Sequence, residues 1–272
     1  MKIFRRFIAF LILSILTQTG GIIYLINTTT FKWINEKTNN KWLASLVKLT
    51  TFLLLYCLAT FLIVPILAKP LGRVRMPIRT TNHIRPATIW TCLLNRNYVR
   101  PVLRDMAFDV ANQMATKYPG TTLNYLDCSF PFINGFPLFP HLSHNDSKKI
   151  DLSFCYNNIQ GIETNEVPSA IGYGICEEPR PGEVNTAEDC GNRGFWQYNI
   201  LRVIVPQGNK VNFTFNETKT KDLVELFASE DATGKIFIEP HLVKRLKLTS
   251  NKIRFHGCRA VRHDDHIHVQ LK

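Results

Sequence analysis

Two long apolar runs dominate the N-terminal part of the chain. Phe7 to Ile26 and Leu49 to Ala68 each contain 20 residues without a charged side chain, which is enough for a helix to cross a hydrocarbon core of about 30 Å. The pattern therefore predicts a membrane anchor over residues 1–69 with two transmembrane helices. The first run also fits a secretory signal peptide, because basic residues precede it and polar Thr17 to Gly20 follow its core. The apolar run resumes at Ile22 and contains no Ala-x-Ala cleavage site, so two helices are preferred.

The pattern changes after Lys69. Pro70, Gly72 and Pro77 interrupt regular structure and predict a linker over residues 70–82. Apolar residues then recur at helical spacing over 101–117, and further helices are expected at 221–229 and 241–247. Short apolar runs predict strands at 121–126, 150–156, 199–205, 235–239, 252–256 and 266–271. We therefore expect residues 83–272 to form an α+β domain, with a mainly antiparallel sheet and flanking helices.

The segment from Asn157 to Gly194 is rich in Pro, Gly, Asn and Glu. It is too long for an ordinary connection, which favours a substrate-binding loop. Cys57 lies in the second apolar run, and the six other cysteines form an even number. Cys176 and Cys190 bracket a Pro- and Gly-rich stretch, so a disulfide between them is favoured over two reduced, buried thiols.

Positive charge is concentrated around the apolar runs. The chain carries 33 Lys and Arg against 21 Asp and Glu, a net charge of +12. Residues 1–69 hold eight basic residues and one Glu, which gives +7, and the remaining 25 basic and 20 acidic residues give +5. Anionic lipid head groups account for the basic flanks. The small excess on the domain requires no nucleic-acid partner.

Histidines cluster at two places in the domain. The chain ends with a His-Asp-Asp-His-Ile-His motif at 263–268, and in a strand His266 and His268 point to the same face. The other cluster contains His144 and, seven residues later, Asp151 at the start of an apolar alternation. His144, Asp151 and His268 form a ligand set suited to Zn²⁺, with one coordination position left for water.

The spacing of these motifs resembles that of the LAS metallopeptidases. His144 followed by Asp151, with His263-x-x-His266-x-His268 far downstream, is most similar to the penicillin-insensitive murein endopeptidases. D-alanyl-D-alanine carboxypeptidases and dipeptidases are more distantly similar. The resemblance covers about residues 97–272. It implies a LAS-type fold in which His144, Asp151 and His268 bind zinc, His266 is a catalytic residue beside the metal, and His263 is a further active-site residue.

The resemblance leaves the general base open between two residues. A related branch uses an acidic residue three positions before the last ligand, where this chain has Asp265. In a strand Asp265 would point away from His266, so His266 is preferred. A protonated His263 or an arginine can stabilise the oxyanion, and Arg100 and Arg104 are candidates for binding a substrate carboxylate.

The resemblance implies a membrane-anchored zinc peptidase that hydrolyses peptide bonds in peptidoglycan cross-links or stem peptides. The family often has Gly at the position of Ser147, a departure that affects the expected substrate more than the metal. Two alternatives stay open: a non-catalytic LAS-like zinc domain that binds cell-wall peptide, and a cytoplasmic-facing peptidase for muropeptides or D-alanyl dipeptides.

The expected location of the domain rests on two conflicting indications. A wall substrate requires an extracytoplasmic domain, whereas Lys and Arg around two transmembrane helices favour both termini in the cytoplasm. We expect a multi-pass protein of the cell membrane whose domain faces outward.

Overall fold

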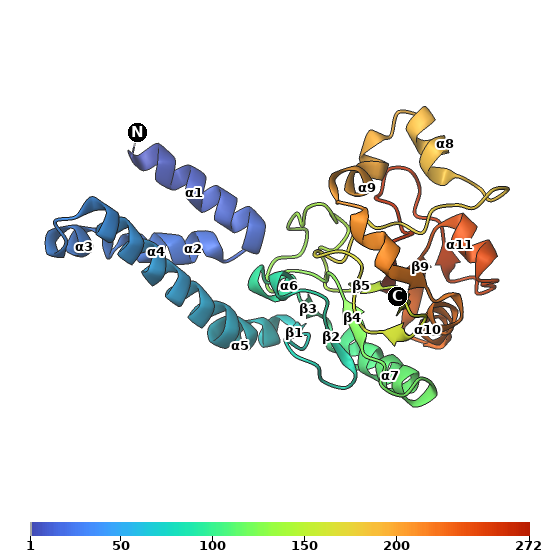
Figure 1. Cartoon of the computed structure of the whole chain (residues 1–272). Coiled ribbons are helices and arrows are strands. Elements are labelled where there is room, and N and C mark those ends of the chain that lie inside the picture. Colours follow the sequence, from blue (N-terminus) through green and yellow to red (C-terminus); the bar gives the residue numbers. More distant parts are fainter. Residues whose placement is uncertain (1) are drawn as a thin grey trace.

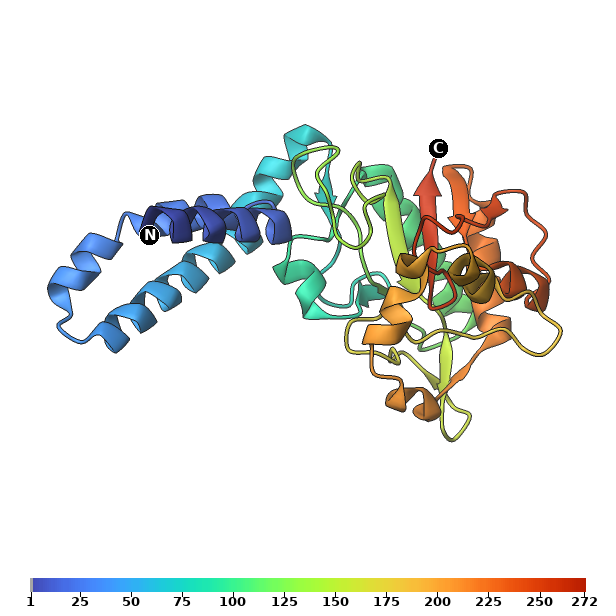
Figure 2. The same cartoon turned by 90° about the horizontal axis from the view of Figure 1, so that it is seen from above.

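The computed structural model describes residues 2–272 as an N-terminal helical arm followed by an α+β domain (Figure 1; Figure 2). The arm begins with α1 (Lys2–Thr17), α2 (Gly20–Thr28) and α3 (Phe31–Lys37). A continuous helix from Lys41 to Leu71 follows. It comprises α4 (Lys41–Leu58), the π-helical turn η1 (Ala59–Ile63), α5 (Val64–Ala68) and the 3₁₀ turn η2 (Lys69–Leu71). The π turn directly precedes Pro65, where a wider turn accommodates a residue that lacks an N–H.

The first apolar run turns back on itself, so the expectation of two transmembrane helices is wrong. Gln18 adopts a φ of 64° and separates α1 from α2, which packs against α1. A Cβ atom at Gly21 would lie 2.0 Å from Ser14 Oγ, so only glycine permits this close contact. Among the described residues, one helix, Lys41–Leu71, is long and apolar enough to cross a membrane.

Polar contacts hold the turn between α1 and α2 against the domain. The backbone N–H of Phe132 donates to Gln18 Oε1 at 2.7 Å, and Asn95 Nδ2 donates to Thr19 Oγ1 at 2.9 Å. These groups are buried or partly buried, where an unpaired polar atom would be costly. The arm therefore contacts the domain through this turn, through Tyr56 of α4, whose hydroxyl donates to the carbonyl oxygen of Leu93, and through the segment that follows Leu71.

Residues 70–82, expected as a linker, pack on the domain. β1 (Val74–Arg75) pairs in antiparallel fashion with β3 (Tyr98–Val99), and Arg73 and Met76 are buried. The Arg73 guanidinium donates to the carbonyl oxygen of Phe130 at 2.8 Å. This connection is consequently ordered by contacts with the domain.

The domain is built on a six-stranded mixed sheet with the order β10-β9-β11-β5-β4-β2. The pairings from β9 through β11 and β5 to β4 are antiparallel, whereas both edge strands pair in parallel. The α+β class is thus confirmed, and the sheet is mixed. Its strands are β2 (Ile84–Pro86), β4 (Leu123–Tyr125), β5 (Lys149–Ser153), β9 (Thr233–Phe237), β10 (Ile253–Arg254) and β11 (His266–Leu271).

One face of this sheet forms the core with α7 (Pro101–Lys117) and α10 (Glu217–Ser229). The helix expected at 101–117 is confirmed, and its buried residues recur at the expected helical spacing. Ile150 and Leu152 of β5 lie in this core beside Ile267 and Val269 of β11. Because strand side chains alternate between faces, Asp151, His266 and His268 are left on the opposite face.

The remaining elements surround that opposite face and the edges of the sheet. Residues 199–205, expected as a strand, instead form the end of a 3₁₀ turn and a helix; a short apolar run does not by its periodicity distinguish the two. The elements are α6 (Ile89–Leu93), α8 (Thr186–Asn192), η3 (Trp196–Asn199), α9 (Ile200–Ile204), η4 (Gly208–Asn212), α11 (Pro240–Arg245), and a small sheet of β6 (Tyr156–Asn158), β7 (Glu163–Thr164) and β8 (Phe213–Phe215).

Cys190 of α8 forms a disulfide with Cys258, which follows β10. The expected pairing of Cys176 with Cys190 is therefore wrong. Cys190 and Cys258 share a small apolar cluster with Tyr198, whereas Cys176 is a buried free thiol in the described chain. Packing of α8 beside the loop after β10, and not proximity in sequence, decides the pairing.

Loss of this disulfide should destabilise the domain. Cys190→Ser is expected to lower the free energy of unfolding by about 4 kcal/mol, because the bridge joins residues 68 apart and restricts the unfolded chain. Urea denaturation of the detergent-solubilised protein measures this, with Cys57→Ser, exposed on the arm, as a control expected to change little. A non-reducing peptide map that links Cys190 to Cys176 would contradict the assignment.

Candidate metal centre

Two neighbouring strands present three of the predicted site residues, Asp151, His266 and His268. β5 and β11 are antiparallel, in a register that pairs His268 with Asp151 and His266 with Ser153. His266 and His268 share one face, as the sequence predicted, while Ile267 between them is fully buried in the core. The strand register thus places an imidazole directly opposite a carboxylate.

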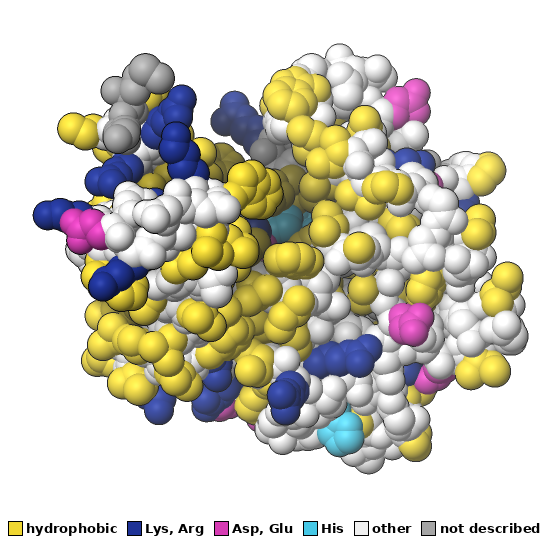
Figure 3. Space-filling view, turned by 60° about the vertical axis from the view of Figure 1, so that its left-hand side comes forward, with side chains coloured by type: hydrophobic (Ala, Val, Ile, Leu, Met, Phe, Trp, Pro, Cys, Tyr) yellow, Lys and Arg dark blue, Asp and Glu magenta, His cyan; other side chains and the backbone are white. Residues whose placement is uncertain are grey.

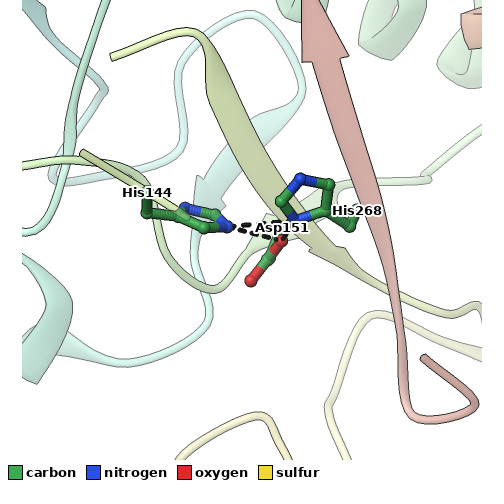
Figure 4. A group of neighbouring side chains, drawn as sticks. All are labelled: His144, Asp151 and His268. Atoms are coloured by element: carbon green, nitrogen blue, oxygen red, sulfur yellow. Dashed lines mark hydrogen bonds and ion pairs between the residues drawn. The ribbon is translucent and has the colours of Figure 1, made fainter. Parts of the chain in front are cut away.

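His144 reaches the same place from the turn before β5, as Figure 4 shows. Its Nε2 lies 3.1 Å from Asp151 Oδ1 and 3.1 Å from His268 Nδ1, and His268 Nδ1 lies 2.8 Å from Asp151 Oδ1. A tetrahedral ion with bonds of about 2.0–2.1 Å holds its ligand atoms roughly 3.3 Å apart. The three buried side chains are close to that spacing, so this group can hold a metal ion.

Hydrogen bonds behind the ligands orient them. His144 Nδ1 lies 2.9 Å from the carbonyl oxygen of Cys128 and donates its proton there, so the Nε2 lone pair faces the group. The hydroxyl of Tyr173 donates to Asp151 Oδ2 at 2.8 Å. Burial raises the pKa of Asp151, but the facing histidines, His144 foremost, outweigh burial and hold that pKa well below its usual range.

Asp265 places His266 beside the ligands. Asp265 Oδ1 accepts a hydrogen bond from His266 Nδ1, and its other oxygen accepts one from the N–H of Gly174. This directs His266 Nε2 toward Asp151, 3.7 Å from Oδ2, where it has no hydrogen-bond partner in the described part of the chain. The expectation that Asp265 points away from His266 is wrong, because Asp265 precedes β11 and does not follow the strand alternation.

The charge on His266 depends on these carboxylates. Burial lowers the pKa of His266, but Asp265 and Asp151 outweigh burial and raise it to about 9. An ion bound to Asp151 would oppose that increase, because its positive charge disfavours a second cation nearby.

His263 lies in the loop before β11, with its ring centroid 4.8 Å from that of His266. Burial, with a further contribution from His266 and other histidines, holds the pKa of His263 well below its usual range. Its imidazole is therefore neutral at physiological pH and is a hydrogen-bond donor and acceptor without a full charge. The sequence-based role of a protonated His263 is not supported.

The arginines predicted to bind a substrate carboxylate lie elsewhere. Arg100 Nη1 donates to the carbonyl oxygen of Leu71 at 3.3 Å, and Arg104 pairs with the adjacent Asp105 at 2.7 Å. Both therefore make local contacts away from the candidate ligands.

His141 and Tyr173 contact the site and were missed as site residues in the sequence. His141 Nδ1 lies 3.6 Å from Asp151 Oδ2 and 3.2 Å from Asp127 Oδ2. The position of His141 three residues before His144 was an available signal. Tyr173 comes from the long segment at 157–194, as predicted for a loop at the site, but no local motif singled it out.

A cavity of about 290 Å³ lies beside the ligands. His144, Asp151 and His268 do not line it, but His141 and Tyr173 do and both approach Asp151, so the cavity adjoins the buried group through these two side chains. Its lining is largely apolar except at the end that contains Arg96 paired with Asp127. The lining residues are Thr88, Trp90, Thr91, Leu94, Arg96, Leu126, Asp127, Pro140, His141, Ile171, Tyr173 and Leu201.

Ser147 shapes the turn that carries His144. It is fully buried and adopts a φ of 62°, a left-handed conformation that costs a residue with a Cβ atom roughly 1–2 kcal/mol. Its N–H donates to Ser129 Oγ at 3.0 Å, which helps to hold the turn. Glycine meets this backbone requirement without strain, which explains physically why it suits this position in the family with similar spacing.

No model of a known protein family matches the chain, and no curated protein matches it either. The case for the metal centre therefore rests on the ligand geometry, the oriented imidazoles and the adjoining cavity.

Removal of either histidine ligand should abolish tight metal binding. His144→Ala and His268→Ala are each expected to weaken zinc binding at least a hundredfold, since each removes one of three ligand atoms. Equilibrium dialysis of the purified full chain with elemental analysis measures this. His83→Ala, an exposed histidine outside the site, is the matched control. Unchanged metal content in both ligand variants would exclude the site.

Proposed function

We propose that the chain is a zinc-dependent peptidase of the cell membrane that hydrolyses peptide bonds in peptidoglycan cross-links or stem peptides. The observation that carries the proposal is the buried triangle of His144, Asp151 and His268 with His266 Nε2 directed toward it. Two imidazoles and one carboxylate match the ligand set of catalytic zinc sites, which keep a position open. The motif spacing resembles that of LAS metallopeptidases. This resemblance implies a LAS-type fold and supports the substrate class.

A zinc ion held by these three residues would supply Lewis acidity toward a water molecule and a substrate carbonyl. His266 accepts a proton from the attacking water at Nε2 and returns it to the leaving amine. Asp265 keeps Nδ1 of His266 protonated and stabilises the imidazolium form. Tyr173 holds Asp151 through its hydroxyl group, so Asp265 and Tyr173 are positioning residues.

The oxyanion requires a hydrogen-bond donor on the opposite side of the substrate. His141 lines the cavity with Nε2 unpaired among the described residues. Because the carboxylate of Asp127 accepts a hydrogen bond from Nδ1, Nε2 would carry a proton to donate only in the imidazolium form of His141, and that form would serve this role in place of the arginines predicted from the sequence.

A non-catalytic domain that binds wall peptide is the second candidate. Such a domain does not need an oriented base beside the ligands. The Asp265–His266 pair favours hydrolysis.

Replacement of the base separates metal binding from chemistry. His266→Ala is expected to lower kcat on purified muropeptides by about 10²–10⁴-fold while leaving the zinc content unchanged, because His266 transfers protons and is not a ligand. Mass spectrometry of the products and elemental analysis of the same sample measure both quantities. Full activity of this variant would rule out His266 as the base.

The arrangement of the arm supports an extracytoplasmic domain. Because α2 returns along α1, the start of α1 and α3 both lie at the end of the arm away from the domain (Figure 1; Figure 2). Arg6 and Lys48 approach the ring of Phe31 there, at 5.6 and 5.2 Å from its centroid. Lys32 and Lys37 of α3 add to the same end. Residues 2–48 contribute seven Lys and Arg at this end, against five from residues 69–85 at the domain end, so the positive-inside rule favours this end in the cytoplasm and the domain outside.

Reporter fusions test this orientation. Alkaline phosphatase fused after Lys272 is expected to be active, because the enzyme matures only outside the cytoplasm. A fusion after Lys41, at the basic end of the arm, is the matched control and should be inactive although expressed. The reverse result would place the domain in the cytoplasm and support an action on recycled muropeptides or D-alanyl dipeptides.

A further inference from the structure

We propose that the cavity beside the candidate metal centre receives its substrate from the bilayer side, and that this substrate is a peptide covalently attached to a lipid. The inference rests on the proposed peptidase function and names the substrate class of that same site. Its basis is the position of the cavity relative to the helical arm.

One short segment, residues 90–95, both lines the cavity and contacts the arm. Trp90 and Leu94, on and just after α6, line the cavity. The hydroxyl of Tyr56, in the long helix of the arm, donates to the carbonyl oxygen of Leu93 at 2.5 Å. Asn95 Nδ2 donates a hydrogen bond to Thr19 Oγ1 in the turn between α1 and α2. The segment that forms the cavity wall therefore also contacts the proposed membrane helix.

Apolar side chains surround this opening. Trp90 is 60% exposed and Ile171 is 47% exposed, and both belong to the cavity lining. Phe139 and Leu142, next to the lining residues Pro140 and His141, are 60% and 52% exposed. Figure 3 shows a histidine at the bottom of a hollow between the arm and the domain, with hydrophobic side chains on both sides.

Such a surface fits an apolar chain that extends from the bilayer. Burial of exposed apolar area is favourable in water, and contact with an acyl or isoprenoid chain would provide that burial. Tryptophan is typical of the boundary between membrane and water, where its ring meets both environments. A free wall peptide is polar, and its binding would not require the exposed apolar side chains that form the rim of the cavity.

The size of the cavity limits the width of the chain that can enter it. An α-helix with its side chains is about 10–12 Å wide, so a membrane protein that leaves the bilayer as a helix does not fit a cavity of about 290 Å³. An extended peptide is narrower and can reach His141 and Tyr173 while its lipid stays in the membrane. The narrow cavity therefore favours a lipid-linked peptide over a membrane protein.

The test uses the full chain in phosphatidylglycerol and phosphatidylethanolamine vesicles. Two probes share one peptide that ends in D-alanyl-D-alanine and carries a benzophenone group; one is palmitoylated at its N-terminus and the other is acetylated. The measurements are kcat/KM for each probe with zinc, and the site of photo-crosslinking, mapped by mass spectrometry, in metal-free protein. Trp90→Ser is compared with Trp196→Ser, a matched change at a residue that is 73% exposed and outside the cavity lining.

We expect kcat/KM at least tenfold higher for the palmitoylated probe, and crosslinks at residues 89–94 or at Ile171. Trp90→Ser should reduce the preference to less than threefold, whereas Trp196→Ser should retain it. This comparison separates recognition at the rim from simple enrichment of the probe on vesicles.

Failure of the lipid-side entry and failure of the peptidase function give different results in this experiment. Equal cleavage of both probes, a preference that Trp90→Ser leaves intact, or crosslinks outside this rim would overturn the lipid-side entry and leave the peptidase function standing. If neither probe is cleaved but the palmitoylated probe still labels α6 in metal-free protein, the peptidase proposal fails for D-alanyl-D-alanine stem peptides and the binding of a lipid-linked peptide stands.

Discussion

Pairing between β5 and β11 determines both the core and the candidate metal centre, because each strand divides its side chains between the two faces of the sheet. Opposite Asp151 stands His268, while Leu152 and Ile267 enter the core from the same two strands. A shift of one residue would bury the imidazoles among α7 and α10 and expose the aliphatic side chains. The hydrophobic energy of the core therefore holds the register that brings the ligands together, and the site needs no separate device to align its strands.

Burial of so many ionisable groups on one face requires compensation within the site. Asp151 is surrounded by imidazoles and a tyrosine hydroxyl, and Asp265 bonds His266 and a backbone N–H. A buried carboxylate without such partners would cost several kcal/mol. The same contacts set the tautomers of His144 and His266, so the groups that stabilise the folded site also direct its lone pairs toward one point.

The arm shows how one tight turn changes the meaning of a hydrophobic run. Length and composition predicted that residues 7–26 form a single membrane-spanning helix, but neither property reveals a reversal in direction. Gln18 takes a positive φ. Gly21 lets α2 approach Ser14 so closely that a Cβ atom at position 21 would clash with the Ser14 side chain. The reversal brings Arg6 beside Phe31 of α3 and polar Gln18 against the domain, whereas Lys69, Arg73 and Arg75 stay at the domain end of the long helix.

The sequence by itself predicted the α+β class, the helix at 101–117, the strands at 150–156 and 266–271, and the group of His144, Asp151 and His268. These features follow from alternation, helical periodicity and motif spacing, which are local. The tertiary structure decided the Cys190–Cys258 pairing, the contact between Asp265 and His266, the approach of Tyr173 and His141 to Asp151, and the position of the cavity beside the arm. Each of these joins loops or irregular segments, whose side-chain directions no period predicts, so their contacts depend on how distant parts of the chain pack together.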